Sequence, residues 1–317
     1  MDLLIQKLVI PYADFPPAHT LMSYPATHVA PRFLLTAMAS RPLVPTPTQY
    51  GRDSSFWVEY PSGLVDLSRT HPLQDAAETP SPPPLKAGQV EISVEGNRTI
   101  RVDTKSTVMV IIDMQNFFLH PQLRDHPTGL QCIDPLTKVV PALRSLGVKI
   151  IWLNWGLTEH ELKTIPPALV RSFQKNGRGG FGFPLPHDFG RLLMRGARNS
   201  ELYGPLQDEF IKGKVAGTDF WIHKNRMSGL WGYQTALDLF LQENGTTTLL
   251  FGGVNADQCV LGTIVDAYFK GYDCVVVRDA TATTSPEGGL ANVLHNAANS
   301  YGFVTDTSSL LRAKTTP

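Results

Sequence analysis

The feature that most constrains the fold is an alternation of apolar runs with helical segments over residues 104–312. Runs such as TVMVIID at 107–113 and KIIWLNW at 149–155 are almost wholly apolar, as strands covered on both faces are. Segments such as 134–146 and 287–300 repeat apolar residues at helical spacing. Four further runs read as strands: DFWIHK at 219–224, TTLLFGG at 247–253, YDCVVV at 272–277 and FVTD at 303–306. This order predicts an α/β fold, a doubly wound, mostly parallel six-stranded sheet with helices on both faces.

Two segments before this domain differ from it in composition. Residues 1–47 are rich in proline, alanine and threonine and have no sustained period. They predict an arm that lies on the core or on a neighbouring subunit, or that is disordered. Residues 48–103 predict a small β appendage. It contains a proline-rich linker, ETPSPPPLKAGQ at 78–89, and QVEISVEGNRTIRVD at 89–103, which alternates on both sides of Gly96-Asn97 as a hairpin does.

The predicted α/β domain ends near residue 312 and is followed by a tail at 313–317. Inside the domain, residues 156–217 lack a regular pattern apart from a short helix near 166–173. The glycine-rich stretch GRGGFGFPLPHDFG at 177–190 predicts loops. Long loops in compact domains usually bind ligands or cover a site, so we interpret 156–217 as an active-site insertion.

Bulk composition excludes several classes of protein. The chain has 317 residues, 42% of them hydrophobic, and a formal net charge of zero. No basic excess exists to pair with phosphates, so we expect no nucleic-acid partner. No run of about 18 apolar residues predicts a membrane span, and the N-terminus lacks the pattern of a secretory signal. Three cysteines in no disulfide or zinc pattern predict free thiols in a reducing, cytoplasmic compartment.

The segment FGGVNADQCVLGTIVDAYFKG, residues 251–271, reads as a strand end, a tight turn and a helix that opens near Cys259. Unpaired N–H groups and the dipole at a helix N-terminus favour a thiolate and can stabilise an oxyanion. Cys259 is therefore a candidate nucleophile, although a lone cysteine is more often a small buried core residue. The helix after it is apolar on two sides, which is compatible with a homo-oligomer contact.

Three functional side chains stand at the carboxyl ends of predicted strands, where ligands bind in such sheets. Asp113 ends the first strand, Lys224 ends the third and Cys259 follows the fourth. Each alone has an ordinary interpretation as a turn residue, a surface charge or a core residue. Their common position on one rim of the sheet favours a catalytic set.

The chain resembles the isochorismatase-like cysteine hydrolase superfamily, which includes nicotinamidases, N-carbamoylsarcosine and ureidoacrylate amidohydrolases, and isochorismatases. The resemblance covers about residues 104–312 and lies in VMVIIDMQNFF, HKNRMSGL and GGVNADQCVLGTIVDAYFKGYDCVVVRDATAT. It implies that Asp113, Lys224 and Cys259 are the catalytic triad. Cys259 would attack a carbonyl carbon to form a thioester, and Asp113 would carry the proton to the leaving nitrogen. Lys224 would favour the ionised forms of both partners.

The resemblance also implies an oxyanion hole made by the backbone N–H groups of Cys259 and Asn255, with a cis bond between Val254 and Asn255. Nicotinamidases carry a metal site that includes an Asp-x-His after the second strand. Here that segment reads LNWGLTEHEL, with His160 but without the acid–histidine pair. We therefore expect no metal and no cofactor.

The substrate is the least determined feature. The resemblance and Cys259 favour hydrolysis of a C–N bond in a small amide, ureido or carbamoyl compound. Isochorismate hydrolysis and a non-catalytic binding or scaffold role remain alternatives. The NWG after the second strand is similar to ureidoacrylate amidohydrolases. The candidate substrate-binding residues are Gln115, Phe117, Phe118, Asn154, Trp155, Trp231 and Tyr233, and the aromatic residues among them fit a plain core as well.

Overall fold

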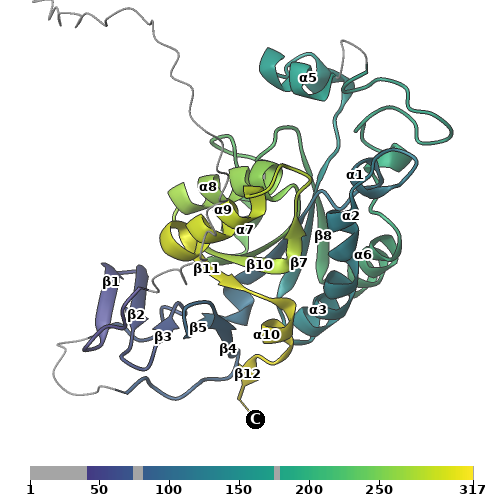
Figure 1. Cartoon of the computed structure of the whole chain (residues 1–317). Helices are drawn as coiled ribbons and strands as arrows, with labels where there is room; N and C mark the ends of the chain where they lie inside the picture. The colour runs from purple at the N-terminus through teal and green to yellow at the C-terminus, as the bar shows by residue number, and fades with distance from the viewer. Residues whose placement is uncertain (1–40, 74–80, 175–178, 317) are drawn as a thin grey trace, which may run out of the picture. The chain divides into compact units, whose positions relative to one another are not determined.

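The computed structural model describes residues 41–73, 81–174 and 179–316 (Figure 1). Most of the predicted arm at 1–47 lies outside the described residues. The described chain contains a parallel sheet that carries the predicted site and a second, mixed sheet built mainly from residues 48–103.

The main sheet has six strands, all parallel, in the order β11-β10-β9-β6-β7-β8. The predicted α/β fold class is confirmed, and all six predicted strands are present. Their bounds are β6 Thr107–Ile112, β7 Lys149–Trp155, β8 Asp219–Lys224, β9 Thr248–Val254, β10 Asp273–Ala282 and β11 Gly302–Thr305. The residues of β6, β7 and β9 are almost entirely buried, because helices cover both faces of a doubly wound sheet.

The strand order reverses between β6 and β9, and this reversal places helices on both faces. The chain runs outward from β6 to β8, then returns to β9 and runs outward in the other direction. Right-handed crossovers in opposite directions lie on opposite faces. Accordingly, α3 (Ile133–Ser145) and α6 (Pro205–Ala216) cover one face, and α7 (Ala236–Glu243), α8 (Leu261–Phe269) and α9 (Gly289–Asn296) cover the other (Figure 1). The cleft-forming switch point is therefore at the carboxyl ends of β6 and β9.

Several helices differ from the sequence prediction. Helix α6 was missed, because its mixed polar and apolar residues have little helical periodicity. Helix α3 begins at Ile133, one residue before the predicted segment 134–146, so Asp134 lies in its first turn. Helix α7 begins only at Ala236, because the Thr235 side chain caps it by accepting from the backbone N–H of Asp238. Four short helices were also not predicted or were only partly predicted: α1 Asn116–Leu119, α2 Pro127–Gln131, α4 Glu159–Leu162 and α10 Thr307–Leu311. The short helix predicted near 166–173 is present as α5, Pro167–Phe173.

The second sheet is mixed and has the order β1-β2-β3-β5-β4-β12. Its hairpin β4–β5 matches the alternation at 89–103, and the tail contributes β12, which pairs with β4. The bounds are β1 Thr48–Arg52, β2 Ser55–Glu59, β3 Leu64–Asp66, β4 Gln89–Val94, β5 Arg98–Asp103 and β12 Lys314–Thr315. Apolar residues of β4 and β5, such as Ile92 and Ile100, belong to the same core as the parallel sheet.

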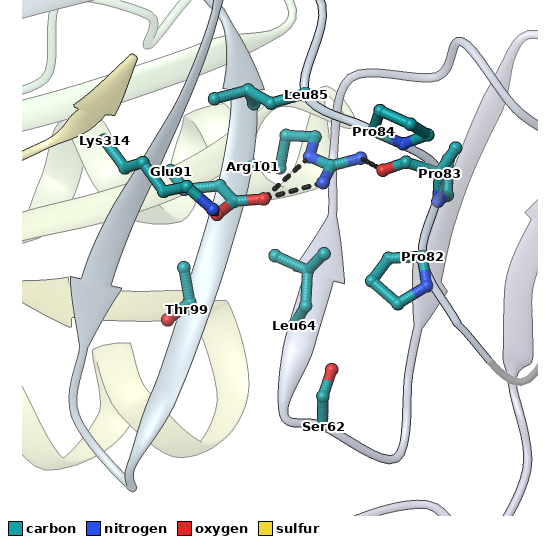
Figure 2. Close-up of a pocket in the computed structure, with 10 residues that line it drawn as sticks. All are labelled: Ser62, Leu64, Pro82, Pro83, Pro84, Leu85, Glu91, Thr99, Arg101 and Lys314. Atoms are coloured by element: carbon teal, nitrogen blue, oxygen red, sulfur yellow. Dashed lines mark hydrogen bonds and ion pairs between the residues drawn. The ribbon is translucent and has the colours of Figure 1, made fainter. Parts of the chain in front are cut away.

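A hollow of about 400 Å³ lies on the mixed sheet, beside Pro82, Pro83 and Pro84 (Figure 2). At its base, Arg101 donates to Glu91 and to the carbonyl of Pro83 and pairs with Asp66. The guanidinium is thus fully engaged within the protein. None of the residues that line this hollow belongs to the predicted triad.

Exposed aromatic residues mark the end of α8. Phe269 is 79% exposed and Tyr268 is 44% exposed, while Ile264 and Ala267 face the core. The predicted homo-oligomer remains a prediction.

Candidate active site

Asp113, Lys224 and Cys259 meet at the switch point of the parallel sheet. Nζ of Lys224 lies 2.9 Å from Oδ2 of Asp113 and 3.4 Å from Sγ of Cys259. The three residues are 111 and 35 positions apart along the chain, and only the parallel order of β6, β9 and β8 brings their strand ends to one rim. All three side chains are buried, so their interactions are little screened by water.

The backbone at Asp113 turns the carboxylate toward its partners. Asp113 has φ of +56°, an uncommon conformation for a residue other than glycine. Its N–H donates to the carbonyl of Leu153 at 3.0 Å, and its Oδ1 accepts from the N–H of Trp155 at 3.3 Å. The end of β7 therefore fixes the carboxylate at the end of β6.

The ammonium of Lys224 has several partners inside the site. Besides its contacts with Asp113 and Cys259, Nζ donates to the carbonyl of Arg226 at 3.2 Å. It also lies 3.9 Å from the centroid of the Trp155 ring, a distance at which the face of an indole attracts a cation. Lys224 is thus held at a fixed place between the carboxylate and the sulfur.

Cys259 lies in a wide first turn of its helix. Residues Ala256–Val260 form a π-helical turn, and the regular helix α8 starts only at Leu261. Before the turn, the peptide bond between Val254 and Asn255 is cis. Gly253 has φ of +120°, and a Cβ there would lie 2.0 Å from the carbonyl oxygen of Ile112. Only glycine lets β9 approach β6 so closely at the point where the turn to Cys259 begins.

Burial and two charged neighbours act in different directions on the pKa of Cys259. Burial raises the pKa of the Cys259 thiol to about 12; Lys224 opposes this shift and Asp113 adds to it. Burial also raises the pKa of Asp113, against the lowering effect of Lys224. One buried ammonium compensates one buried anion, so a carboxylate and a thiolate do not coexist there. Desolvation therefore opposes the ionisation of Cys259 that the helix N-terminus and Lys224 favour.

This protonation state predicts the pH dependence of Cys259 alkylation in the absence of substrate. The thiolate fraction rises about tenfold per pH unit below the pKa. We expect alkylation by iodoacetamide to be slow at pH 7 and to rise without a plateau up to about pH 10. Mass spectrometry of the modified peptide measures it, and Cys259→Ala identifies labelling at other cysteines. A plateau at pH 7 to 8 would show that a stable thiolate is present.

His126 supports the turn before Cys259 and was not predicted from the sequence. Its Nε2 lies 2.8 Å from Oδ1 of Asn255, and its Nδ1 accepts from the N–H of Gly129 at 2.9 Å. Because Nδ1 is an acceptor, Nε2 carries the proton and donates to Asn255. The N–H of Thr284 also donates to the same oxygen. Two donors, one of them the buried ring of His126, thus fix the side chain of Asn255, and no local pattern around His126 indicates such a long-range contact.

Gln115 connects the end of β7 to the insertion. Its Oε1 accepts from the N–H of Trp155 at 3.0 Å, and its Nε2 donates to the carbonyls of Trp155 and Ser200. These contacts use both amide hydrogens. Gln115 therefore holds the strand end that orients Asp113, and its amide has no hydrogen left for a substrate.

Asn154 and Trp155 carry buried polar atoms without partners. Within the described part of the chain, the amide oxygen and nitrogen of Asn154 and Nε1 of Trp155 have no hydrogen-bond partner. Unpaired buried polar groups are rare and call for an explanation. Their position at the end of β7, beside the triad, is compatible with the predicted contact to a substrate.

An aromatic cluster surrounds Trp155. Phe173 and Phe181 from the insertion pack on the Trp155 ring at 5.5 and 5.1 Å between centroids, and Phe117 lies 6.4 Å from Phe173. Phe117 packs edge-on against Phe118. Phe173 and Phe181 were not predicted, because nothing local to the irregular segment 156–217 indicates where its aromatic residues lie.

Trp231 and Tyr233 have exposed side chains. Tyr233 is 89% exposed and Trp231 is 51% exposed. The Trp231 ring lies under the Arg226 guanidinium, and its Nε1 donates to Asn225. The prediction that these two residues line the pocket finds no support in their positions, since both stand on the surface of the loop before α7.

Two further features concern the described part of the chain only. Within residues 41–73, 81–174 and 179–316, no group of three or more His, Cys, Asp or Glu side chains is arranged to hold a metal ion. In the same ranges, no helix is long and apolar enough to cross a membrane.

The region of the sequence that carries this site matches a known family. The profile of the isochorismatase domain matches residues 107–309, which include all three triad residues. The chain belongs to the isochorismatase family. The predicted resemblance is thereby confirmed, and the mixed sheet of this chain is built mainly from residues outside the matched region.

Named relatives of this family member include amidohydrolases. The ureidoacrylate amidohydrolase RutB of Caulobacter segnis is 29% identical over 231 residues, which cover 71% of this chain and 92% of RutB. The structure of nicotinamidase PncA from Bacillus subtilis is 26% identical, with a TM-score of 0.50, and covers 63% of this chain and 99% of its own. A cysteine hydrolase from Pseudomonas syringae pv. phaseolicola shares the fold at 19% identity, with a TM-score of 0.54, over 67% of this chain and 93% of its own.

Proposed function

We propose that this protein is a metal-independent cysteine hydrolase that cleaves the C–N bond of a small amide, ureido or carbamoyl compound. One observation carries the proposal: the Lys224 ammonium contacts the Asp113 carboxylate at 2.9 Å and the Cys259 sulfur at 3.4 Å. A base, a cation and a nucleophile in one buried contact form the arrangement that thiol activation requires. The relatives named as amidohydrolases support the same class of reaction.

The first half of the reaction forms a thioester. Asp113 takes the thiol proton of Cys259 as the sulfur attacks the substrate carbonyl carbon. The raised pKa of the thiol favours a proton transfer that accompanies the attack. The oxyanion accepts hydrogen bonds from the N–H groups of Asn255 and Cys259. Asp113 then delivers the proton to the leaving nitrogen, the C–N bond breaks, and the amine or ammonia departs.

The second half releases the acid. Asp113, again a carboxylate, takes a proton from water as the water oxygen attacks the thioester carbon. The C–S bond breaks and the thiolate recovers the proton from Asp113. Lys224 compensates the single negative charge that moves between carboxylate, sulfur and oxyanion, which keeps the net charge of the buried site constant.

A panel of small amides, ureas and carbamoyl compounds tests this function. We expect release of ammonia or amine from at least one member, measured with wild type and Cys259→Ala in parallel. Pyruvate release from isochorismate is measured in the same panel, and pyruvate without any C–N cleavage would support the vinyl-ether alternative. A wild type that is inert throughout, like the mutant, would favour a binding or scaffold role.

A further inference from the structure

The side chain of Asn255, the residue at which the chain leaves β9 and turns toward Cys259, is held from two sides. Its Oδ1 accepts from Nε2 of His126 at 2.8 Å and from the backbone N–H of Thr284 at 3.3 Å. His126 is buried directly before α2, and Thr284 lies in the loop after β10. Two segments outside β9 therefore fix the orientation of this one side chain.

The ring of His126 is itself fixed by the first turn of α2. Its Nδ1 accepts from the N–H of Gly129 at 2.9 Å, so the ring proton is on Nε2 and faces Oδ1 of Asn255. A Cβ at position 129 would lie 2.7 Å from this Nδ1, so glycine allows the ring to approach the helix this closely. His126 thus presents one donor in one direction.

A second series of contacts holds another part of the same turn. The hydroxyl of Thr128 donates to the carbonyl of Thr283 at 2.9 Å, and the hydroxyl of Thr283 donates to Oδ1 of Asp257 at 2.6 Å. Asp257 lies in the π-helical turn of the nucleophile, two residues after Asn255. The start of α2 therefore contacts this turn directly through His126, and indirectly through the loop after β10.

The backbone N–H of Asn255 is unpaired. Within residues 41–73, 81–174 and 179–316 it donates to no acceptor, although the residue is buried. Buried N–H groups without a partner are rare. Such a donor stabilises an oxyanion only if it points to the place where the negative charge develops. The bonds to the Asn255 side chain fix the Cα to which this nitrogen is attached, so they also fix the direction of the N–H.

We propose that His126 is a positioning residue, which orients the N–H of Asn255 toward the oxyanion by donating to the Asn255 side chain. This inference rests on the proposed function and adds the group that sets one of its two oxyanion donors. The donor acts in the transition state and not on the bound substrate, so its displacement lowers kcat and leaves KM unchanged. Deletion of a whole oxyanion donor costs about 10²- to 10³-fold in kcat, and a displaced donor should cost roughly 10- to 100-fold.

Two substitutions test the two nitrogens of the His126 ring separately, on any amide that wild type hydrolyses. The amide of asparagine reaches the position of Nδ1, and that of glutamine reaches the position of Nε2. His126→Asn keeps the acceptor for Gly129 but loses the donor to Asn255, so kcat should fall roughly 10- to 100-fold at unchanged KM. His126→Gln keeps the donor and loses the acceptor, so kcat should stay within a few-fold of wild type while the midpoint of urea unfolding falls.

A double variant tests whether His126 acts through Asn255. Asn255→Ala removes the other partner of the same hydrogen bond and should lower kcat by a similar factor. His126→Asn should then cause no further loss of kcat when it is added to Asn255→Ala, because the contact is already absent. Losses that multiply would show that His126 acts independently of Asn255 and would overturn the inference.

His120→Asn is the matched control. Nδ1 of His120 also accepts from a backbone N–H, that of Gln122, but its ring packs on Phe189 and Tyr203, so kcat should remain that of wild type. A wild-type kcat in His126→Asn would overturn this inference alone. If that variant does not fold, a wild-type kcat in Asn255→Ala overturns it equally. A wild type that hydrolyses no member of the panel would overturn the proposed function and this inference with it.

Discussion

Replacing Cys259 with alanine is expected to lower turnover of any amide that the protein hydrolyses by on the order of 10⁴-fold or more, because no other group can form the acyl intermediate. Sγ is the only nucleophilic atom in contact with both the Lys224 ammonium and the proton-accepting carboxylate among the described residues. The measurement is kcat under saturating substrate, together with mass spectrometry of quenched enzyme. Wild type should show an added acyl mass on the peptide that contains Cys259.

Cys274→Ala is the matched control for this loss. Cys274 is also buried and its pKa is also raised by burial. Among the residues that the structure describes, however, the hydrogen-bond partners of its sulfur are the carbonyls of Ile264 and Tyr272. Its removal should leave kcat within a few-fold of wild type. Equal activity in wild type and Cys259→Ala would contradict the assignment of Cys259 as the nucleophile. An added acyl mass on Cys274 would instead identify Cys274 as the nucleophile.

Replacing Lys224 with methionine is expected to reduce the free energy of unfolding by about 3–5 kcal/mol and to abolish measurable turnover. Removing one partner of a buried ion pair leaves the other as an uncompensated buried charge. Asp113 is that charge, since its side chain is fully buried and Lys224 is its ion-pair partner. Urea unfolding measures the stability. Lys138→Met, which breaks the exposed pair with Asp134, should cost no more than about 0.5 kcal/mol.

The double variant Asp113→Asn, Lys224→Met separates stability from chemistry. It removes both buried charges, so it should recover part of the stability that Lys224→Met loses, while activity remains absent. If the double variant loses as much free energy of unfolding as the two single variants lose together, the two side chains are not coupled.

The pH dependence of Lys224→Met gives a second measure of the same pair. Burial already raises the pKa of Asp113, and Lys224 opposes that rise, so losing Lys224 raises the pKa further. Between the unfolded and the folded pKa of this carboxyl, the folded state binds more protons than the unfolded state. The stability of the variant should therefore fall as pH rises through that window, and more steeply than for wild type. Urea unfolding at pH 5 and pH 8 measures the free energy of unfolding of both proteins. An equal change between the two pH values in wild type and Lys224→Met would contradict this prediction.

The sequence by itself determined the strands and the rim of the sheet. Runs such as 107–113 and 149–155 are apolar over their whole length, and this pattern is local, so the parallel sheet and the positions of Asp113, Lys224 and Cys259 at its carboxyl ends were predictable. Helix α6 was missed because its polar and apolar residues follow no clear helical period.

Only the tertiary structure decided the electrostatic properties of the site. The raised pKa of Cys259 and the bond from His126 to Asn255 depend on which groups from distant segments come together and exclude water. The burial and the pairing of a group depend on all of its neighbours in space, and no local pattern of the sequence predicts them. For the same reason Trp231 and Tyr233, predicted to line the pocket, stand on the surface, while Phe173 and Phe181 pack on Trp155.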